Sequence, residues 1–274
     1  MAYDIILGRD KSDKKKFGKK GLIYLGKGYV TMGNYTSLAN KIWLDVVRTH
    51  VILIAGKRGS GKSYSIGVIA EELSDLPDEV KQNIAPLIFD TMGIFWTMKY
   101  KNEKELELLD EWGLKSKNLP VKVWVPAGYF EEYEKRGIPA DNRFALGASE
   151  LDIEDWLSIF QLDMISQISV LIQKAISTLA NEQSYCLDDI IDKIKLNSDS
   201  SDEVKKSAIA LFEAAKSWKI FAKKGENATT INELIKAGTT SVLDLSVYSS
   251  TSVFNVRALV IGLISKKLFD QRML

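Results

Sequence analysis

Apolar residues follow two patterns along the chain, and the first is a series of short runs. Residues 1–48 contain DIILG, GLIYLG and GYVTMG, which are separated by glycines and by a stretch rich in lysine. Short apolar runs bounded by glycine predict strands, so we expect a small β element, or a fragment of one, in this region. The stretch contains five lysines: Lys14, Lys15, Lys16, Lys19 and Lys20. They either contact phosphate groups, such as those of a DNA backbone, or belong to a solvated hairpin loop.

From Val51 onward, apolar strand-like runs alternate with segments of helical periodicity. The expected elements are, in order, a buried strand over Val51–Ala55, a helix over Lys62–Leu73, a strand over Pro86–Asp90, an acidic helix over Glu103–Trp112 that stops at Gly113, and a strand over Val121–Val125. Strands separated by helices of this length form parallel βαβ units. The fold class is therefore predicted to be α/β, with a mostly parallel sheet.

Between about Gly147 and Gly225 the pattern becomes helical throughout. Asp152 is placed to cap one helix, and a further helix is expected over Val204–Trp218. Five apolar residues share one face of the helix between them: Ile165, Ile168, Ile172, Ile176 and Leu179. We interpret this segment as an all-α insertion within an α/β domain that spans residues 49–274.

The strand pattern resumes after the insertion. Thr230 and Glu233 are spaced as a capping box for a short helix that ends near Gly238, and SVLDLS (residues 241–246) is predicted to be a core strand. The last helix carries its apolar residues on one face: Val256, Leu259, Val260, Leu263, Ile264 and Leu268.

Composition narrows the class of protein. With 46% hydrophobic and 27% charged residues, the chain is typical of a globular protein, and its net charge of +1 provides no overall attraction to nucleic acid or to a membrane. A single cysteine and a single histidine exclude an internal disulfide and a zinc site. No secretory signal is visible, and the long apolar segments carry Lys174 and Arg257, so we expect a cytoplasmic protein without a membrane span.

The strongest motif is GKRGSGKS, residues 56–63, which matches the phosphate-binding pattern GxxxxGK[ST] between a predicted strand and a predicted helix. Lys62 is expected to reach the β- and γ-phosphates, and the Ser63 hydroxyl is expected to bind Mg²⁺. Arg58 either adds charge at the phosphates or faces solvent. The nucleotide-binding residues are predicted to be Gly56, Lys57, Arg58, Gly59, Ser60, Gly61, Lys62, Ser63 and Tyr64.

Hydrolysis also needs acids at strand ends, and the sequence offers two candidates. Asp90 ends PLIFD and Asp244 lies in SVLDLS, although each of them can also simply end a strand or cap a turn. Asp90 begins DTMG, which fits the DxxG loop of GTPases. The pair Asn40-Lys41, however, precedes the phosphate loop and lacks the following Asp that guanine recognition needs, so an ATPase is favoured over a GTPase switch.

His50 and Cys186 are the remaining candidates for chemistry. His50 stands at the entry to the first predicted core strand, where a structural hydrogen bond is favoured over catalysis. Cys186 lies in the helical region without a nearby histidine, which favours a small buried residue over a nucleophile.

Four segments in this order resemble the central ATPase domain of the HerA family of HerA/FtsK-like DNA translocases (helicase HerA central domain, DUF87), from about Asp45 onward: LDVVRTHVILIAGKRGSGKSYSIGVIAEEL, LIFDTMGIFW, FALGASELDIEDWLSIFQL and INELIKAGTTSVLDLS. The resemblance implies a RecA-like ASCE P-loop ATPase that uses ATP and Mg²⁺. It also implies self-assembly into a ring, typically a hexamer, that moves along double-stranded DNA, often with a nuclease partner.

By the same resemblance, Gly56–Ser63 would be the Walker A motif, with Lys62 acting in catalysis. Asp90 with Gly93 would match a strand-end Asp-x-x-Gly, and Asp244 with Ser246 an "IDLS" strand.

Two departures from the family pattern qualify this expectation. The Walker B strand ending in Asp-Glu-Ala-His, which supplies the general base and a magnesium-bound acid, is absent from the sequence, and the N-terminal β-barrel of the family is usually longer than residues 1–48. We therefore expect a partial barrel and an ATPase core whose C-terminal part lies beyond residue 274, or else a short relative that binds nucleotide without efficient turnover. The alternative function is a nucleotide-dependent binding module, or a GTPase-like switch, without DNA translocation.

Overall fold

The computed structural model describes residues 3–182, 184–248 and 254–273, and the chain divides into two compact units. The first unit comprises residues 1–87, 97–121 and 235–240, and the second comprises residues 88–96, 122–234 and 241–274.

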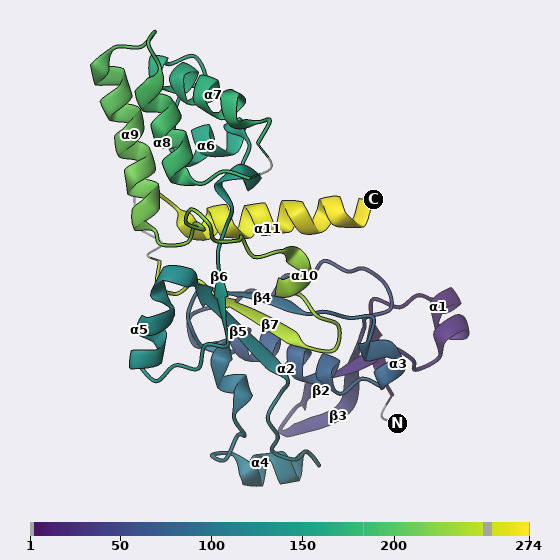
Figure 1. Ribbon diagram of the computed structural model, residues 1–274. Coiled ribbons are helices and arrows are strands. Elements are labelled where there is room, and N and C mark those ends of the chain that lie inside the picture. The colour runs from purple at the N-terminus through teal and green to yellow at the C-terminus, as the bar shows by residue number, and fades with distance from the viewer. Residues whose placement is uncertain (1–2, 183, 249–253, 274) are drawn as a thin grey trace. The chain divides into compact units, whose positions relative to one another are not determined.

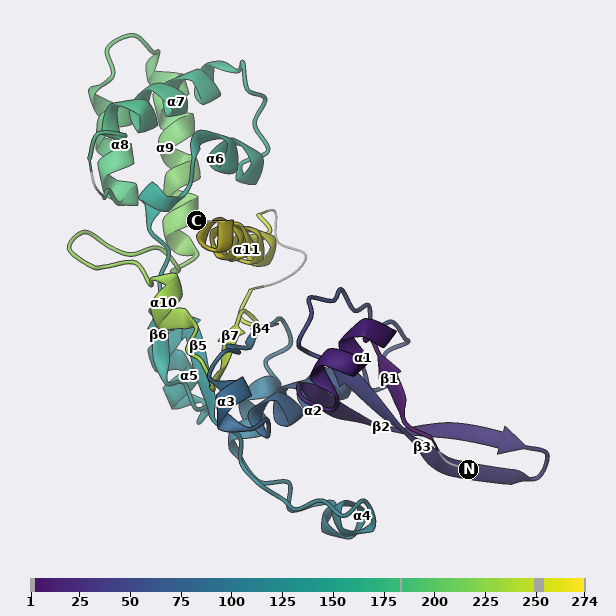
Figure 2. The ribbon, with the colours of Figure 1, turned by 90° about the vertical axis from the view of Figure 1, so that its right-hand side faces the viewer.

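The first unit begins with a three-stranded sheet. Strand β3 (Tyr35–Asp45) lies between β1 (Ile5–Leu7), which is parallel to it, and β2 (Leu22–Met32), which is antiparallel. Figure 2 shows the β2–β3 hairpin running beyond β1, which pairs only with residues 42–44.

Two expectations for this region were wrong. The runs GLIYLG and GYVTMG form the single strand β2, because Gly26 and Gly28 lie at register shifts in a continuous ladder instead of at strand ends. Lys14, Lys15 and Lys16 lie in helix α1 (Lys11–Phe17) and not in a hairpin loop, because the Asp10 carboxylate accepts the Asp13 N–H and caps this helix. Strand β3 was not predicted.

A buried ion pair closes the small sheet. The Arg9 guanidinium donates to the Asp45 carboxylate, and its Nη1 and Nη2 donate to the carbonyls of Gly18 (2.7 Å) and Lys20 (2.8 Å). His50 Nε2 lies 3.2 Å from Asp45 Oδ2, so the structural hydrogen bond expected for this histidine is confirmed. Burial opposes ionisation of Asp45, but the bonds from Arg9 and His50 outweigh it and lower the pKa of the carboxyl below its usual range.

Helix α2 (Lys62–Ser74) packs on this sheet and confirms the predicted helix. Its Ile69 and Leu73 contact the buried cluster of Ile23, Leu44 and Leu76. The remaining helices of the unit are α3 (Asp78–Lys81) and α4 (Leu106–Glu111). Helix α4 is shorter than the predicted helix 103–112, and Gly113, with φ of 67°, ends it as expected.

The predicted buried strand over Val51–Ala55 was wrong. These residues form no strand, and the side chains of Val51 and Leu53 are almost fully exposed. A strand exists only when a neighbouring strand bonds to it, and no strand of the described ranges pairs with this run. The apolar pattern is typical of a strand, but local sequence does not specify the partner with which a strand has to pair.

The second unit carries a four-stranded, all-parallel sheet, which confirms the predicted α/β class. The strand order is β4 (Leu87–Asp90), β7 (Thr240–Asp244), β5 (Val121–Pro126) and β6 (Asn142–Phe144). Every residue of β7 is buried, as a central strand requires. Strand β6 was not predicted because it has only three residues, two of them polar; helix α5 (Phe130–Lys135), which follows β5, was also missed.

The helical region 147–225 forms the helices α6 (Ile153–Ile159), α7 (Gln167–Leu179), α8 (Leu187–Leu196) and α9 (Asp202–Ser217), which lie together in Figure 1. The Asp152 carboxylate accepts the Asp155 N–H and caps α6 as predicted. The buried Trp156 ring forms the core with Phe160, Phe212 and Phe221, at centroid distances of 5.5, 5.1 and 5.4 Å.

One residue of the predicted helical face lies elsewhere. Ile172, Ile176 and Leu179 are buried as expected, but Ile165 precedes α7 and is 85% exposed. Ser166 caps the helix by accepting the Ser169 N–H, so the helix begins at Gln167, two residues after Ile165.

The chain ends with α10 (Ile231–Leu234) and α11 (Val256–Met273). Thr230 and Glu233 form the predicted capping box, with reciprocal bonds of 2.8 and 3.3 Å, but α10 ends at Leu234, before Gly238. Val260, Leu263 and Ile264 of α11 are buried. Among the described residues, no helix has the length and apolar character needed to cross a bilayer.

Candidate nucleotide-binding site

The loop between Gly56 and Lys62 belongs to the first unit and leads directly into α2. Gly59 and Gly61 have φ angles of 81° and 86°, in the left-handed region that side chains with a Cβ rarely adopt. The loop backbone therefore depends on glycine at the two positions where the motif carries it.

The N-terminus of α2 is open to an anion. Gly61 is its N-cap and supplies no side-chain acceptor, and the first turn contains no acidic residue. Free N–H groups and the positive end of the helix dipole attract negative charge at such a terminus. Helices α6 and α9, in contrast, are capped by Asp152 and Ser201.

The lysine of the motif lies over its own loop. Lys62 Nζ donates a 2.7 Å hydrogen bond to the carbonyl of Lys57. Lys62 and Ser63 are half-buried, whereas Lys57, Arg58 and Tyr64 are exposed. An ammonium held at the loop in this way can exchange a carbonyl for a phosphate oxygen, because both are hydrogen-bond acceptors.

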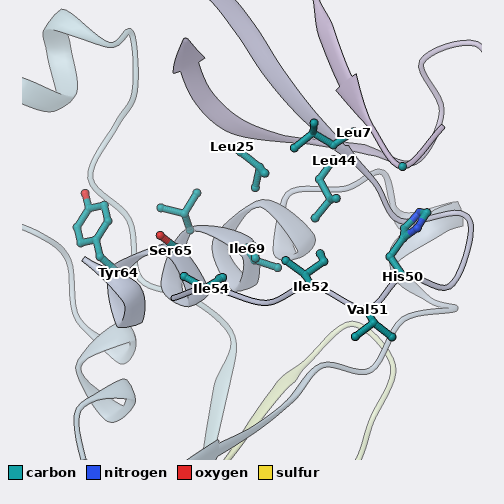
Figure 3. A pocket seen from close by; sticks show the side chains of 12 residues that line it. Leu7, Leu25, Leu44, His50, Val51, Ile52, Ile54, Tyr64, Ser65 and Ile69 are labelled. Carbon is teal, nitrogen blue, oxygen red and sulfur yellow. The ribbon is translucent and has the colours of Figure 1, made fainter. Parts of the chain in front are cut away.

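A cavity of about 470 Å³ lies between the run that precedes the loop, the inner face of α2 and the N-terminal sheet (Figure 3). Leu7, Leu25 and Leu44 line it from the sheet, while Ile52 and Ile69 line it from the run and from α2. The segment that leads into the loop thus borders a mainly apolar cavity.

In the second unit, the Asp90 carboxylate is occupied by its own loop. Its Oδ1 accepts the N–H groups of Met92 and Gly93 (3.0 and 2.8 Å), and its Oδ2 accepts those of Ile94 and Phe95 (2.7 and 2.8 Å). Asp90 therefore holds the DTMG turn in place. Gly93, with φ of 68°, packs so closely on Ser246 that a Cβ would clash with the Ser246 hydroxyl.

Asp244 ends the strand next to β4 and has a different environment. Its Oδ1 accepts the Ser246 N–H at 2.8 Å, and the side chain is buried. Burial, together with the nearby charge of Asp90, raises the pKa of the Asp244 carboxyl above its usual value. A carboxyl with a raised pKa keeps its proton to higher pH than a free aspartate does, which suits it to proton transfer.

Two residues near Asp244 were missed in the sequence analysis. Tyr133 of α5 is buried, its hydroxyl lies 3.3 Å from Ser246 Oγ, and this hydroxyl lowers the pKa of the neighbouring Asp244 carboxyl. Arg257 of α11 donates to the carbonyls of Leu245 (3.2 Å) and Ser246 (3.3 Å). Tyr133 is 113 residues away from Ser246 in sequence, and neither residue belongs to a motif, so no local signal identified them.

Cys186 behaves as the sequence suggested. It is buried at the start of α8, and its Sγ–H donates to Asp189 Oδ2 at 3.1 Å. Burial and this acidic neighbour raise the pKa of the thiol, which opposes formation of a nucleophilic thiolate.

The structure brings the predicted residues together in two groups. The loop residues 56–64 lie in the first unit, and Asp90, Gly93, Asp244 and Ser246 lie at the carboxyl ends of β4 and β7 in the second. Ligands of open parallel sheets bind at such strand ends.

Comparison with known proteins agrees with this arrangement. The family described as "Helicase HerA, central domain" matches residues 28–268, which is most of the chain. None of the curated proteins compared matches it. The phosphate loop, the parallel sheet and the extent of this match lead to one conclusion: the chain belongs to the family of the helicase HerA central domain.

Proposed function

We propose that this chain is the ATP-binding motor domain of a HerA-like DNA translocase, which couples ATP hydrolysis to movement on double-stranded DNA. Membership of the family makes it a P-loop ATPase motor domain. The observation that carries the nucleotide assignment is the uncapped N-terminus of α2, which directly follows a loop that requires glycine at positions 59 and 61.

The residues at this loop fit a magnesium-bound triphosphate. The backbone N–H groups of residues 56–62 would hold the α- and β-phosphates, and Lys62 would reach the β- and γ-phosphates in place of the Lys57 carbonyl. Ser63 would bind Mg²⁺ through its hydroxyl, while Arg58 and Tyr64 border the nucleotide from their exposed positions. When bound, ATP supplies a phosphoanhydride bond whose hydrolysis drives the motor.

Of the two candidate acids, Asp244 is the better one for a catalytic role. The carboxylate oxygens of Asp90 already accept four backbone N–H groups, whereas Asp244 accepts one and has a raised pKa. We assign Asp244 to proton transfer or to holding magnesium-bound water, and we assign Asp90 to shaping the loop beside it.

The partners follow from the family. Motors of this kind act on DNA as oligomers, so we infer a ring, with the hexamer as its expected form, around double-stranded DNA. A nuclease subunit is the further partner that the resemblance suggests. Because the net charge is only +1, DNA contact has to come from local basic groups.

The alternative, a GTPase-like switch, has less support. Such a switch orders its DxxG loop through the γ-phosphate. Here the Asp90 carboxylate accepts the N–H groups of residues 92–95, so the turn is held by an acid of its own loop.

Phosphate release with and without duplex DNA, measured at several salt concentrations, tests the motor assignment. A motor domain is expected to prefer ATP over GTP and to bind duplex DNA with an affinity that falls steeply as salt rises. A preference for GTP, together with a DNA affinity that does not change with salt concentration, would contradict the motor assignment and favour the GTPase-like switch.

A further inference from the structure

A second cavity in the first unit, with a volume of about 700 Å³, lies on the face of α2 near α4. Residues of β2, α2 and α4 line it, together with the segment that follows α4. Its size falls in the range of pockets that bind small organic molecules.

One part of the lining is apolar and aromatic. Leu108, Leu109 and Trp112 come from α4 and its C-terminal cap, and Tyr24 comes from β2. The Trp112 ring already binds a cation, because Lys27 Nζ lies 4.7 Å from its centroid. This lining suits a hydrocarbon or aromatic body.

The other part of the lining is acidic. Four carboxylates line the cavity (Glu71, Glu72, Asp75 and Glu105) against two lysines (Lys115 and Lys117). The ammonium of Lys117 pairs with both Glu71 and Asp75. This one positive charge offsets one of the two negative charges.

Glu72 is the exception among the acids of α2. Its Oε2 accepts the backbone N–H of Tyr24 at 3.0 Å, and no ion pair to it occurs among the described residues. Burial raises the pKa of this carboxyl above its usual value. The charge of Lys117 also acts on Glu72, but that ammonium is paired with Glu71 and Asp75, so a ligand that supplies a further cation stabilises the Glu72 carboxylate.

We propose that this cavity is a binding site for a small organic cation, an ammonium or guanidinium group on an apolar body, whose charge pairs with Glu72 while its body packs on Leu108, Leu109 and Trp112. The apolar lining selects for the apolar body of the ligand, and the Glu72 carboxylate selects for its positive charge. The four carboxylates disfavour an anion, and a purely polar cation gains nothing from the apolar lining.

Helix α2 links this site to the phosphate loop. It begins at Lys62 in the loop and carries Glu72 two turns or more further along, and Tyr64, the residue after Ser63, borders the cavity. An occupied cavity is therefore expected to change nucleotide affinity, and nucleotide to change cation affinity by the same factor. This coupling rests on the proposed function, whereas binding of the cation does not.

The test uses 4-phenylbutylammonium and the uncharged 4-phenylbutan-1-ol, which have similar size and shape, in calorimetric titrations of the whole chain without nucleotide. The ammonium is expected to bind saturably, and the alcohol at least about tenfold more weakly, because it cannot pair with the carboxylate. Glu72→Gln should reduce the ammonium affinity by a similar factor. Glu107→Gln is the matched control: Glu107 lies on α4, is exposed and is not part of the lining.

Leu108→Lys provides a second test that does not alter Glu72. Leu108 is 46% exposed, so lysine is tolerated there, and its ammonium would compete with the ligand inside the cavity. Any of three results would overturn the proposal. They are equal affinity for the ammonium and the alcohol, unchanged affinity in both Glu72→Gln and Leu108→Lys, and the absence of saturable binding. A repeat with ATP present tests the coupling separately.

Discussion

Asp90 and Asp244 end adjacent parallel strands, yet their carboxylates differ in what they hold. Asp90 accepts four backbone N–H groups from its own loop, and Asp244 accepts one and is buried beside Tyr133. The Leu245 N–H, next to Asp244, donates to the Asp90 carbonyl at 2.8 Å. The two acids are thus close in the fold but are suited to different tasks.

Asp90→Ala is expected to destabilise the protein. The substitution leaves four N–H groups of residues 92–95 without their acceptor, which should lower the free energy of unfolding by about 2–4 kcal/mol. Urea denaturation measures the change. An unfolding free energy equal to that of the wild type would show that the carboxylate does not hold this loop.

Asp244→Asn, in contrast to Asp90→Ala, is expected to stabilise the protein, and it is also expected to lower turnover. Folding raises the pKa of Asp244 above the value of 3.8 that an unfolded aspartate has, so the folded protein holds this proton more tightly. The resulting stabilisation is fully present at pH below 3.8 and is lost as the pH rises through the folded-state pKa. The asparagine does not ionise, so the variant should gain stability over the wild type as pH rises through that window. Thermal unfolding across pH measures this difference.

The same variant is expected to release phosphate at least about tenfold more slowly under conditions where the wild type turns over, if Asp244 transfers a proton or holds metal-bound water. A variant that keeps full turnover would remove Asp244 from the catalytic machinery, whatever its stability.

Tyr133→Phe tests whether the tyrosine positions Asp244. The Tyr133 hydroxyl lowers the pKa of Asp244, so its loss should raise that pKa further and move the acid limb of the pH–rate profile to higher pH. Tyr129→Phe, which keeps the ring contact with Tyr248, is the matched control. An unshifted profile in Tyr133→Phe, equal to that of the control, would argue for a purely structural tyrosine.

Gly61→Ala tests the loop geometry independently of charge. At φ of 86° an alanine costs about 1–2 kcal/mol, and relief of this strain should distort the loop and weaken ATP binding. Gly67→Ala in the same helix is the control, because no atom lies within 4 Å of its added Cβ, and helix propensity predicts a gain of about 0.5–1 kcal/mol. ATP affinity that is equal in both variants would contradict the role given to Gly61.

Local signals predicted the elements that local interactions form. The caps at Asp152 and at Thr230 with Glu233 were identified from residues three apart, and the structure confirms both. The phosphate loop was likewise predictable from local sequence, because the spacing of glycine and lysine within eight residues determines its geometry.

Features that depend on distant partners were not predictable. The apolar run over Val51–Ala55 reads as a strand, but pairing depends on another segment, and none of the described residues supplies it. Strand β6 is too short to show a period, and Tyr133 reaches Ser246 across 113 residues of sequence. The division of the chain at residue 48, and the insertion boundaries at about 147 and 225, remain predictions.

The central claim, that residues 56–63 bind a nucleotide triphosphate, is tested most directly by an ATP titration of the wild type and of Lys62→Ala in Mg²⁺. Lys15→Ala, on the exposed surface of α1, controls for the loss of one positive charge. ATP affinity is expected to fall at least about tenfold in Lys62→Ala and to stay unchanged in Lys15→Ala. Equal ATP affinity in all three proteins would contradict the assignment of the site.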